Sequence, residues 1–298
     1  MSTPRTIGMI GIGLMGHGIA ANLLRHGHSL RFLEHPGNQP VDDLLAAGAT
    51  PMATPREVAR GAEVVILCVT GTPQVESVLF ESDGVLEGLD EGTVVIDCST
   101  AIPRSTEAVA ERVAAAGGRF MDAAMTRTPK EAAEGRLNLI VGAPEALFDE
   151  VRPLLEDFAE NITHGGPVGS GHTLKLLHNY VSLGFSAVLA EAAAAARAGG
   201  IDAAALLEVL GNGGGAGVVL ERLRPFISAE DASGFRFSLA NTFKDIGYYN
   251  AMAADLGAER EVAGAIESLY RRINEAGHGE RLVPELITLL APGNSPQS

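Results

Sequence analysis

The stretch Gly11-Ile12-Gly13-Leu14-Met15-Gly16 stands between an apolar run, Ile7-Gly8-Met9-Ile10, and a segment of helical periodicity that starts at His17. A glycine-rich turn between a buried strand and a helix suits a pyrophosphate, because the helix start offers free N–H groups and a positive dipole. Gly11 would permit the tight turn, Gly13 the close approach of the phosphates, and Gly16 the packing of helix on strand. These six residues therefore predict a dinucleotide-binding turn.

An acidic residue follows the second predicted strand at the place where a Rossmann fold binds ribose. Glu34 comes directly after the run 29–33 and eighteen residues after Gly16. A carboxylate there accepts hydrogen bonds from both ribose hydroxyls of NAD and repels the 2′-phosphate of NADP, and the next residue is His35 rather than an arginine. We therefore expect NAD in preference to NADP. The alternative is that Glu34 merely ends an ordinary strand.

Composition limits the partners of the chain. Its 298 residues are 46% hydrophobic, which is enough for one large or two moderate cores. A formal charge of −15 and a pI near 4.9 would repel phosphate backbones, so nucleic acid is not an expected partner. Cys68 and Cys98 lie in or beside predicted core strands, without the spacing of a metal site. We expect two reduced core thiols, no metal and a cytoplasmic protein.

Neither apolar stretch of the chain predicts a targeting or membrane segment. The N-terminal stretch is broken by five glycines within residues 8–18, so we expect no signal peptide. The stretch 180–190 continues into the alanine run 192–196 but is interrupted by Glu191 and followed by Arg197. It falls short of the roughly 20 strongly apolar residues that a membrane span needs. We expect a long helix buried among other helices, and no membrane partner.

Up to residue 164 the chain alternates short β-branched runs with helical segments, which is typical of a doubly wound α/β Rossmann domain with a parallel sheet. The predicted strands are 6–10, 30–33, 64–69, 94–97, 119–122 and 138–141. The predicted helices are 17–26, 41–47, 55–60, 74–80, 103–116 and 144–158. We assign residues 1–164 to an NAD-binding Rossmann domain.

After the glycine cluster 165–171 no convincing strand follows, and helical periodicity dominates. The predicted helices are 172–198, 202–210, 216–227, 238–256, 259–276 and 283–290. Residues 165–298 are therefore expected to form an all-α domain for substrate binding and dimerisation.

Three polar side chains meet on one face of the first of these helices. Lys175 and Asn179 are four residues apart, and His178 lies beside them. The spot begins one turn after the glycine cluster, where a helix N-terminus can depress the pKa of a lysine. The alternative is a solvated polar stripe on an amphipathic helix.

With these residues the chain resembles the β-hydroxyacid dehydrogenases, the family that includes 3-hydroxyisobutyrate, tartronate semialdehyde and sulfolactaldehyde reductases. The resemblance covers essentially the full length. Four blocks carry it in order: 11–16, 122–128, 166–179 with the pattern Gly-x-x-Gly-x-Gly-x-x-x-Lys-x-x-x-Asn, and 243–245.

The resemblance implies a role for each remaining candidate. Lys175 would be the general acid/base at the substrate oxygen, which agrees with the proton chemistry of a partly buried lysine. Asn179 would orient lysine and substrate. Lys244 would approach the substrate or the nicotinamide ribose. The residues expected along the cofactor are Val69, Thr70 and Thr100, of which Thr100 has an alternative role as the N-cap of the helix at Pro103.

Two departures from the family pattern bear on the substrate. The usual Ser-Gly-Gly that takes the substrate carboxylate is here Thr126-Arg127-Thr128. The added guanidinium suggests that the substrate carries a more highly charged group, and the segment is similar to that of sulfolactaldehyde reductases. The alternative is a surface arginine in a structural ion pair.

His178 is similar to the histidine of 6-phosphogluconate dehydrogenases, and we expect it to bind substrate. Their proton-donating glutamate is replaced by Ser182, which argues against decarboxylation.

The sequence thus predicts an NAD-dependent oxidoreductase that interconverts a small anionic 3-hydroxy acid, or a sulfonate analogue, and its aldehyde or ketone. We expect a homo-oligomer, because the small-residue helix 186–198 offers a close-packing surface and family members are dimers or tetramers. Two alternatives stay open. An imine reductase on the same scaffold would typically lack Lys175, and a non-catalytic NAD(H)-binding redox sensor would need no Lys175–Asn179 pair.

Overall fold

The computed structural model describes residues 3–293, which form two compact units. The units divide between Lys175 and Leu176, inside the long helix α8 (Ser170–Ala198). The domain boundary expected between residues 164 and 165 lies eleven residues earlier and stays a prediction.

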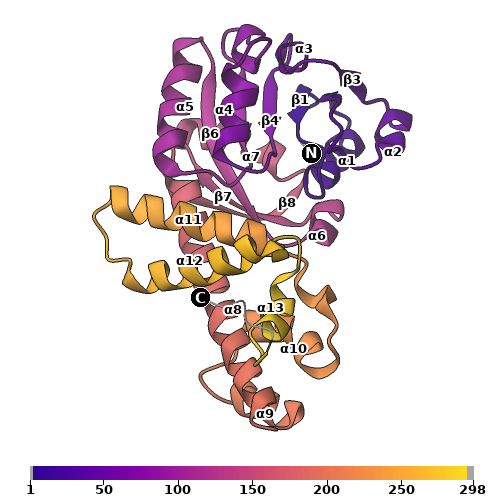
Figure 1. Ribbon diagram of the computed structural model, residues 1–298. Coiled ribbons are helices and arrows are strands. Elements are labelled where there is room, and N and C mark those ends of the chain that lie inside the picture. Colours follow the sequence, from indigo (N-terminus) through magenta and orange to yellow (C-terminus); the bar gives the residue numbers. More distant parts are fainter. Residues whose placement is uncertain (1–2, 294–298) are drawn as a thin grey trace. The chain divides into compact units, whose positions relative to one another are not determined.

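An eight-stranded sheet organises the first unit, in the order β3-β2-β1-β4-β5-β6-β7-β8 (Figure 1). Its first six strands have the order of a dinucleotide-binding doubly wound fold. The Rossmann prediction is therefore confirmed. The strands are β1 (Thr6–Ile10), β2 (Ser29–Leu33), β3 (Thr50–Met52), β4 (Val64–Leu67), β5 (Val94–Asp97), β6 (Arg119–Thr126), β7 (Leu137–Gly142) and β8 (Ala159–Gly166).

The sheet is not wholly parallel, which corrects the expectation of a parallel sheet. β6 and β7 pair antiparallel, with Ala124 opposite Ile140, whereas every other pair is parallel. Only residues 127–136 connect the two strands, and they include the short helix α6 (Pro129–Ala133). A parallel crossover takes a dozen or more residues, so this connection favours an antiparallel return.

The two strands that the sequence did not reveal are the edges of the sheet. β3 is three residues long and contains Pro51, which an edge strand tolerates because one side of it needs no N–H donors. β8 is largely polar and partly exposed along its length, so it carries no apolar run.

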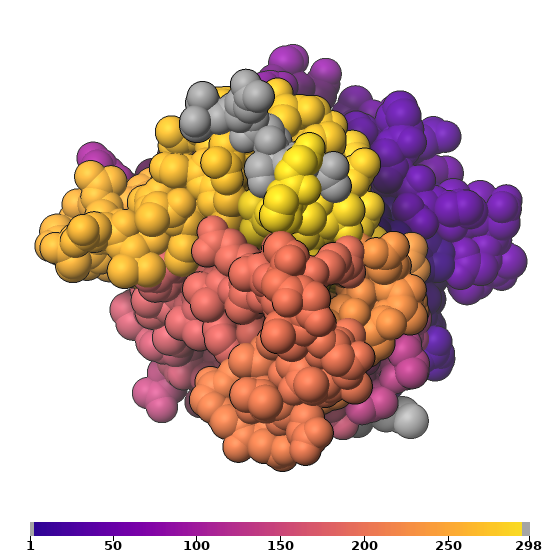
Figure 2. Space-filling model, turned by 60° about the horizontal axis from the view of Figure 1, so that its bottom comes forward, coloured from indigo at the N-terminus to yellow at the C-terminus, as the bar shows by residue number. Residues whose placement is uncertain are grey.

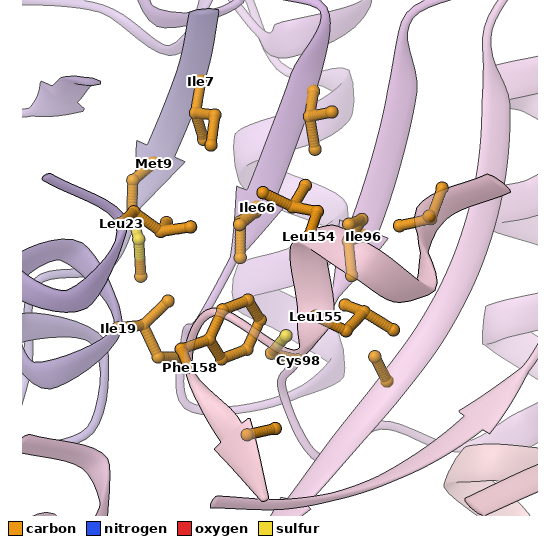
Figure 3. Close-up of a cluster of buried hydrophobic side chains, with 14 of the residues drawn as sticks. Ile7, Met9, Ile19, Leu23, Ile66, Ile96, Cys98, Leu154, Leu155 and Phe158 are labelled. Atoms are coloured by element: carbon orange, nitrogen blue, oxygen red, sulfur yellow. The ribbon is translucent and has the colours of Figure 1, made fainter. Parts of the chain in front are cut away.

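Helices cover both faces of the sheet and create two separate cores. Figure 3 shows one core, in which Ile7 and Met9 of β1, Ile66 of β4 and Ile96 of β5 point toward side chains of α1 (Gly16–Arg25) and α7 (Glu145–Leu155). The other core packs the opposite side chains, such as Val65 and Val95, against three other α-helices of this unit. Those are α3 (Pro55–Ala59), α4 (Thr72–Phe80) and α5 (Pro103–Ala115), while α2 (Asp42–Ala46) follows β2.

The second unit is helical, as expected. Beyond β8 the residues up to 293 contain no strand, only an isolated bridge between Ser238 and Leu282. Its core surrounds Tyr270, whose buried hydroxyl donates to the Leu183 carbonyl at 2.9 Å. α9 and α10 lie side by side (Figures 1 and 2). After α8 the helices are α9 (Ala203–Gly211), α10 (Val218–Ala229), α11 (Leu239–Asp255), α12 (Glu261–Ile273) and α13 (Leu286–Leu289).

α8 is the one helix among residues 3–293 that is long and apolar enough to cross a membrane by length and composition alone. The core helices of soluble proteins pass the same test, so this is weak evidence for a span. Leu183, Leu189 and Ala190 of α8 are buried in the core of the second unit.

Candidate functional site

The three glycines of the glycine-rich turn differ in the space around them. Gly11 has φ +99°, and a Cβ there would lie 2.2 Å from the Cys68 carbonyl oxygen. A Cβ on Gly16 would lie 1.9 Å from the Gly11 oxygen, so the protein itself requires both glycines. A Cβ on Gly13, by contrast, would meet nothing within 4 Å. Open space over Gly13, beside the start of α1, fits the approach of a dinucleotide pyrophosphate.

Glu34, like this turn, lies at the carboxyl ends of the parallel strands. It follows the last residue of β2 and is exposed, and its backbone N–H donates to the Met52 carbonyl at 2.9 Å. The loop that begins at Glu34 returns to the glycine-rich turn, where Gln39 N–H donates to the Ile12 carbonyl at 2.7 Å. The structure thus brings the acidic residue and the turn residues into one loop cluster.

The loops after β4 and β5, which carry Val69, Thr70 and Thr100, are tied to each other. Val69 N–H donates to the Ser99 hydroxyl oxygen at 3.0 Å, and Ile102 N–H donates to the Thr72 hydroxyl oxygen at 2.9 Å. The N-cap of α5 is Ile102, so the alternative that Thr100 caps this helix is wrong.

The substrate segment 126–128 begins at the last residue of β6. The Thr126 hydroxyl accepts the Asn138 amide at 3.1 Å. The Thr128 hydroxyl accepts Lys130 N–H at 3.3 Å and donates to Glu131, so it caps α6. Both hydroxyls therefore have structural partners in addition to any role toward a substrate.

Arg127 combines a left-handed backbone conformation with an ion pair to a neighbouring carboxylate. Its φ of +83° is in the left-handed region, where the family pattern has Gly. The guanidinium donates to the carboxylate of Glu160 and to the Arg136 carbonyl. The hydrogen bond from Arg127 lowers the pKa of Glu160 below its usual value. The ion-pair alternative thus describes a contact that Arg127 makes.

A carboxylate of the sheet holds the beginning of α8. Asp122 on β6 is fully buried, and its two oxygens accept Gly169 N–H at 2.7 Å and His172 N–H at 2.8 Å. A negative charge at a helix N-terminus is favourable both as a hydrogen-bond acceptor and through the helix dipole. Lys175 follows His172 by three residues, so Asp122 fixes the turn that leads to the lysine.

In the second unit, a buried carboxylate joins three predicted site residues. Asp245 is 2% exposed; its Oδ2 accepts the Asn179 amide at 2.7 Å and its Oδ1 lies 3.2 Å from Lys244 Nζ. Nδ1 of His178 lies 3.0 Å from the Asn179 amide oxygen. Asn179, His178 and Lys244 therefore form one polar network through Asp245.

The predicted site residues thus fall into two groups. The first unit holds the glycine-rich turn, Glu34, the loops after β4 and β5, residues 126–128 and Lys175, and the second holds the network around Asp245. Sequence reasoning assigned no role to the polar residues that support these groups, namely Asp97, Asp122, His172 and Asp245, although the last three lie within the blocks that carry the family resemblance. The available signal was an aspartate that closes each of two apolar strand runs, at 97 and 122.

Two family models together match nearly the whole chain. Residues 6–166 match the NAD binding domain of 6-phosphogluconate dehydrogenase, and residues 169–290 match the NAD-binding model of NADP-dependent 3-hydroxyisobutyrate dehydrogenase. The chain belongs to the β-hydroxyacid dehydrogenase family. It is accordingly an oxidoreductase that uses NAD(P), and the resemblance found in the sequence is confirmed.

Individual β-hydroxyacid dehydrogenases are similar over most of their lengths. An NAD-dependent L-serine dehydrogenase of Pseudomonas aeruginosa is 31% identical, with 93% of this chain and 95% of that protein covered. A 3-sulfolactaldehyde reductase of Escherichia coli is also 31% identical, with 92% of each covered. The solved structure of a Mycobacterium tuberculosis 3-hydroxyisobutyrate dehydrogenase with L-serine has a TM-score of 0.85 at 26% identity, covering 97% of this chain and 99% of that one.

Imine reductases share the fold of this β-hydroxyacid dehydrogenase. One from Myxococcus stipitatus has a TM-score of 0.61 at 22% identity, with 97% of this chain and all of that chain covered. At that identity the likeness extends to the fold alone. The hydroxyacid dehydrogenase relatives therefore support the main prediction better than the imine reductase alternative.

Proposed function

We propose that the protein interconverts a small anionic 3-hydroxy acid, or its sulfonate analogue, and the corresponding aldehyde or ketone, with NAD in preference to NADP. The observation that carries the proposal is the buried Asp122, which anchors the helix of Lys175 to the same strand that leads into the segment 126–128. A proton donor and an anion-binding segment are thereby linked through one strand.

Lys175 supplies the proton in this proposal. In the reducing direction its ammonium group donates a proton to the carbonyl oxygen, and in the oxidising direction the neutral amine removes the proton of the hydroxyl group. Bound NAD(P)H would supply the hydride in the reducing direction, and bound NAD(P)+ would accept it in the oxidising direction. Asn179, one turn further along α8, orients the reacting groups, and Asp245 fixes the direction of its amide.

The preference for NAD rests on Glu34. Its carboxylate is exposed at the end of β2, beside the loop that contacts the glycine-rich turn, and no arginine follows it. A carboxylate at this position accepts hydrogen bonds from the ribose hydroxyls and repels a 2′-phosphate.

The proposed substrate is short and anionic. The relatives are named for L-serine and 3-sulfolactaldehyde, which both carry a three-carbon skeleton with an acidic group. We assign the acidic group to the segment Thr126-Arg127-Thr128. We separately propose His178 and Lys244 of the second unit as substrate-binding residues. No nucleic acid or membrane partner is part of the proposal, and the location is cytoplasmic.

We further propose a homo-oligomer formed through the second unit. Leu177, Val181 and Val188 follow one another on one face of α8 and are 41%, 68% and 57% exposed. An exposed apolar stripe of this kind is suited to a second copy of the chain. Light scattering coupled to size-exclusion chromatography tests it, with Val181→Glu expected to yield monomers.

A spectrophotometric screen tests the reaction. NADH and NADPH are offered with succinic and methylmalonic semialdehydes, sulfolactaldehyde and a cyclic imine, and the oxidised cofactors with 3-hydroxy acids, L-serine included. We expect turnover of at least one hydroxy acid or semialdehyde and none of the imine. Turnover of the imine alone would favour the imine reductase, and tight NADH binding without any turnover would favour the redox sensor.

A further inference from the structure

Among the buried side-chain atoms of the first unit that have no hydrogen-bond partner within residues 3–293, two face each other. They are Oδ2 of Asp97 and Nε2 of His172, 3.9 Å apart. The two side chains are 1% and 0% exposed. Buried polar atoms without partners are unfavourable, and a shift of about 1 Å would bring these two to hydrogen-bond distance with one proton between them.

Asp97 connects the two loops expected along the cofactor. It ends β5, and its neighbours Ile96 and Cys98 point into the core between the sheet and α7 (Figure 3), so Asp97 points to the opposite face. Its Oδ1 accepts Ser99 N–H at 2.9 Å, and the Ser99 hydroxyl accepts Val69 N–H at 3.0 Å. One carboxylate therefore orders the backbone after both β4 and β5.

His172 connects the same carboxylate to the helix of Lys175. It lies in the first turn of α8, three residues before the lysine, and its backbone N–H is held by Asp122. Nδ1 lies 2.7 Å from the Thr106 hydroxyl, which donates to the Ile102 carbonyl. Nδ1 must then carry a hydrogen toward Thr106, which leaves Nε2 directed at Asp97.

We propose that Asp97 and His172 form a positioning pair that holds the loops after β4 and β5 in register with the first turn of α8. The pair then keeps Lys175 and the loops after β4 and β5 in one relative arrangement. The inference rests on the proposed function in one respect, because it takes Lys175 as the proton donor. The pair itself does not touch the reacting atoms.

Burial favours the protonated form of the Asp97 carboxyl group. Burial raises the pKa of Asp97, His172 and the hydrogen bonds from Ser99 lower it, and the nearby Asp122 raises it again. Asp122 accepts two backbone N–H groups. Burial also raises the pKa of the neighbouring Cys98 thiol well above its usual value, so that thiol stays neutral. One proton shared by carboxylate and imidazole satisfies both unpartnered atoms.

Substitutions by amide side chains test the pair. Asp97→Asn keeps the acceptor for Ser99 but removes the charge. His172→Asn can replace only the Nδ1 contact with Thr106, whereas His172→Gln places an amide where Nε2 was. We expect Asp97→Asn and His172→Asn to lower kcat at least about tenfold while the Kd for NADH changes less than about threefold. His172→Gln should keep kcat much closer to the wild-type value than His172→Asn does.

A second buried histidine–aspartate contact serves as the matched control. His28 lies 2.9 Å from Asp157 and precedes β2, at the other end of that strand from Glu34. His28→Gln should lower the melting temperature and leave kcat unchanged below it. If Asp97→Asn and His172→Asn behave as His28→Gln does, the pair is merely structural and the proposal is overturned.

Native-state hydrogen exchange gives a readout independent of turnover. We expect Asp97→Asn to speed exchange in the first turn of α8 and His172→Asn to speed it at residues 69–70 and 99–100, each about tenfold, with α9 unchanged. Faster exchange confined to the element that carries the substitution would overturn the proposal. If the wild type turns over none of the compounds in the screen, the proposed function fails. The exchange pattern then still shows whether Asp97 and His172 act as a positioning pair.

Discussion

The side-chain amide of Asn179 donates to Oδ2 of Asp245 at 2.7 Å, and both side chains are buried in the second unit. This bond decides which way the amide faces, because only its NH₂ group can donate to a carboxylate. The amide oxygen is consequently the atom next to His178. The same carboxylate lies 3.2 Å from Lys244 Nζ, so one acidic group orders three polar side chains.

Replacement of Asp245 should therefore impair turnover. We expect Asp245→Ala to lower kcat roughly 10- to 100-fold, which corresponds to loss of a buried charged hydrogen bond worth about 1.5–3 kcal/mol. Asp245→Asn keeps an acceptor and should lose less. Steady-state kinetics measure both variants. Asp255→Asn, an exposed aspartate at the end of the same helix, is the control and should match the wild type.

Lys175 should prove essential for chemistry but not for cofactor binding. Lys175→Ala is expected to lower kcat by roughly 10²–10⁴, the usual effect of removing a positioned acid/base, with the Kd for NADH nearly unchanged. Stopped-flow kinetics and fluorescence titration with NADH measure the two quantities. Turnover close to that of the wild type would remove the lysine from the mechanism and return weight to the sensor alternative.

Much of the first unit could be predicted because its inner strands are continuous apolar runs. β1 and β5 begin and end at the predicted residues, since strands covered on both faces need no polar alternation. Strand direction is not encoded in such runs, which is why the antiparallel return of β7 was missed. β3 and β8 lie at edges, where burial imposes little pattern on the sequence.

The site could be predicted where it is local in the sequence and not where it depends on tertiary contacts. The glycine-rich turn is six consecutive residues, and each glycine has the environment that the motif requires. Asp122 and His172 are 50 residues apart, and Asn179 and Asp245 are 66 residues apart. No spacing rule joins such partners, so only the fold reveals that they support Lys175 and Asn179.

Glu34 should control the choice of cofactor. We expect kcat/KM to favour NAD over NADP in the wild type, and Glu34→Ala to reduce this preference by about 1–3 kcal/mol, the value of a charged hydrogen-bonding pair. Glu34→Gln removes the charge but keeps an acceptor, which separates repulsion of the 2′-phosphate from binding of the ribose. A wild-type enzyme that prefers NADPH would refute the assignment.

The cysteines should be unreactive while the protein is folded. Burial, and to a lesser degree Asp97, raises the pKa of Cys68 from 9.0 to about 12. Since the thiolate is the reactive form, alkylation of Cys68 at pH 8 should be roughly a thousandfold slower than that of an ordinary thiol. Mass spectrometry after iodoacetamide treatment should show neither cysteine modified in buffer and both modified in urea. Rapid native modification of Cys68 would contradict the structure.

Substitutions in the Arg127–Glu160 pair test whether Arg127 binds substrate or is only structural, because the direction of the change in KM differs between the two roles. If Arg127 binds the acidic group of the substrate, Glu160 competes for the same guanidinium. Glu160→Gln should then lower KM severalfold, and Arg127→Ala should raise KM roughly 10- to 100-fold, since a bidentate charged contact is worth about 1.5–3 kcal/mol. Sulfolactaldehyde should suffer more from Arg127→Ala than succinic semialdehyde does.

Arg127→Gly provides the control for the backbone, because it removes the guanidinium and relieves the left-handed conformation at φ +83°. We expect it to raise KM as Arg127→Ala does while the protein melts at a higher temperature than that variant. If instead all three substitutions leave KM unchanged for both aldehydes and alter only the melting temperature, Arg127 is a structural residue. The substrate would then belong among the ordinary short 3-hydroxy acids, whose single carboxylate needs no added guanidinium.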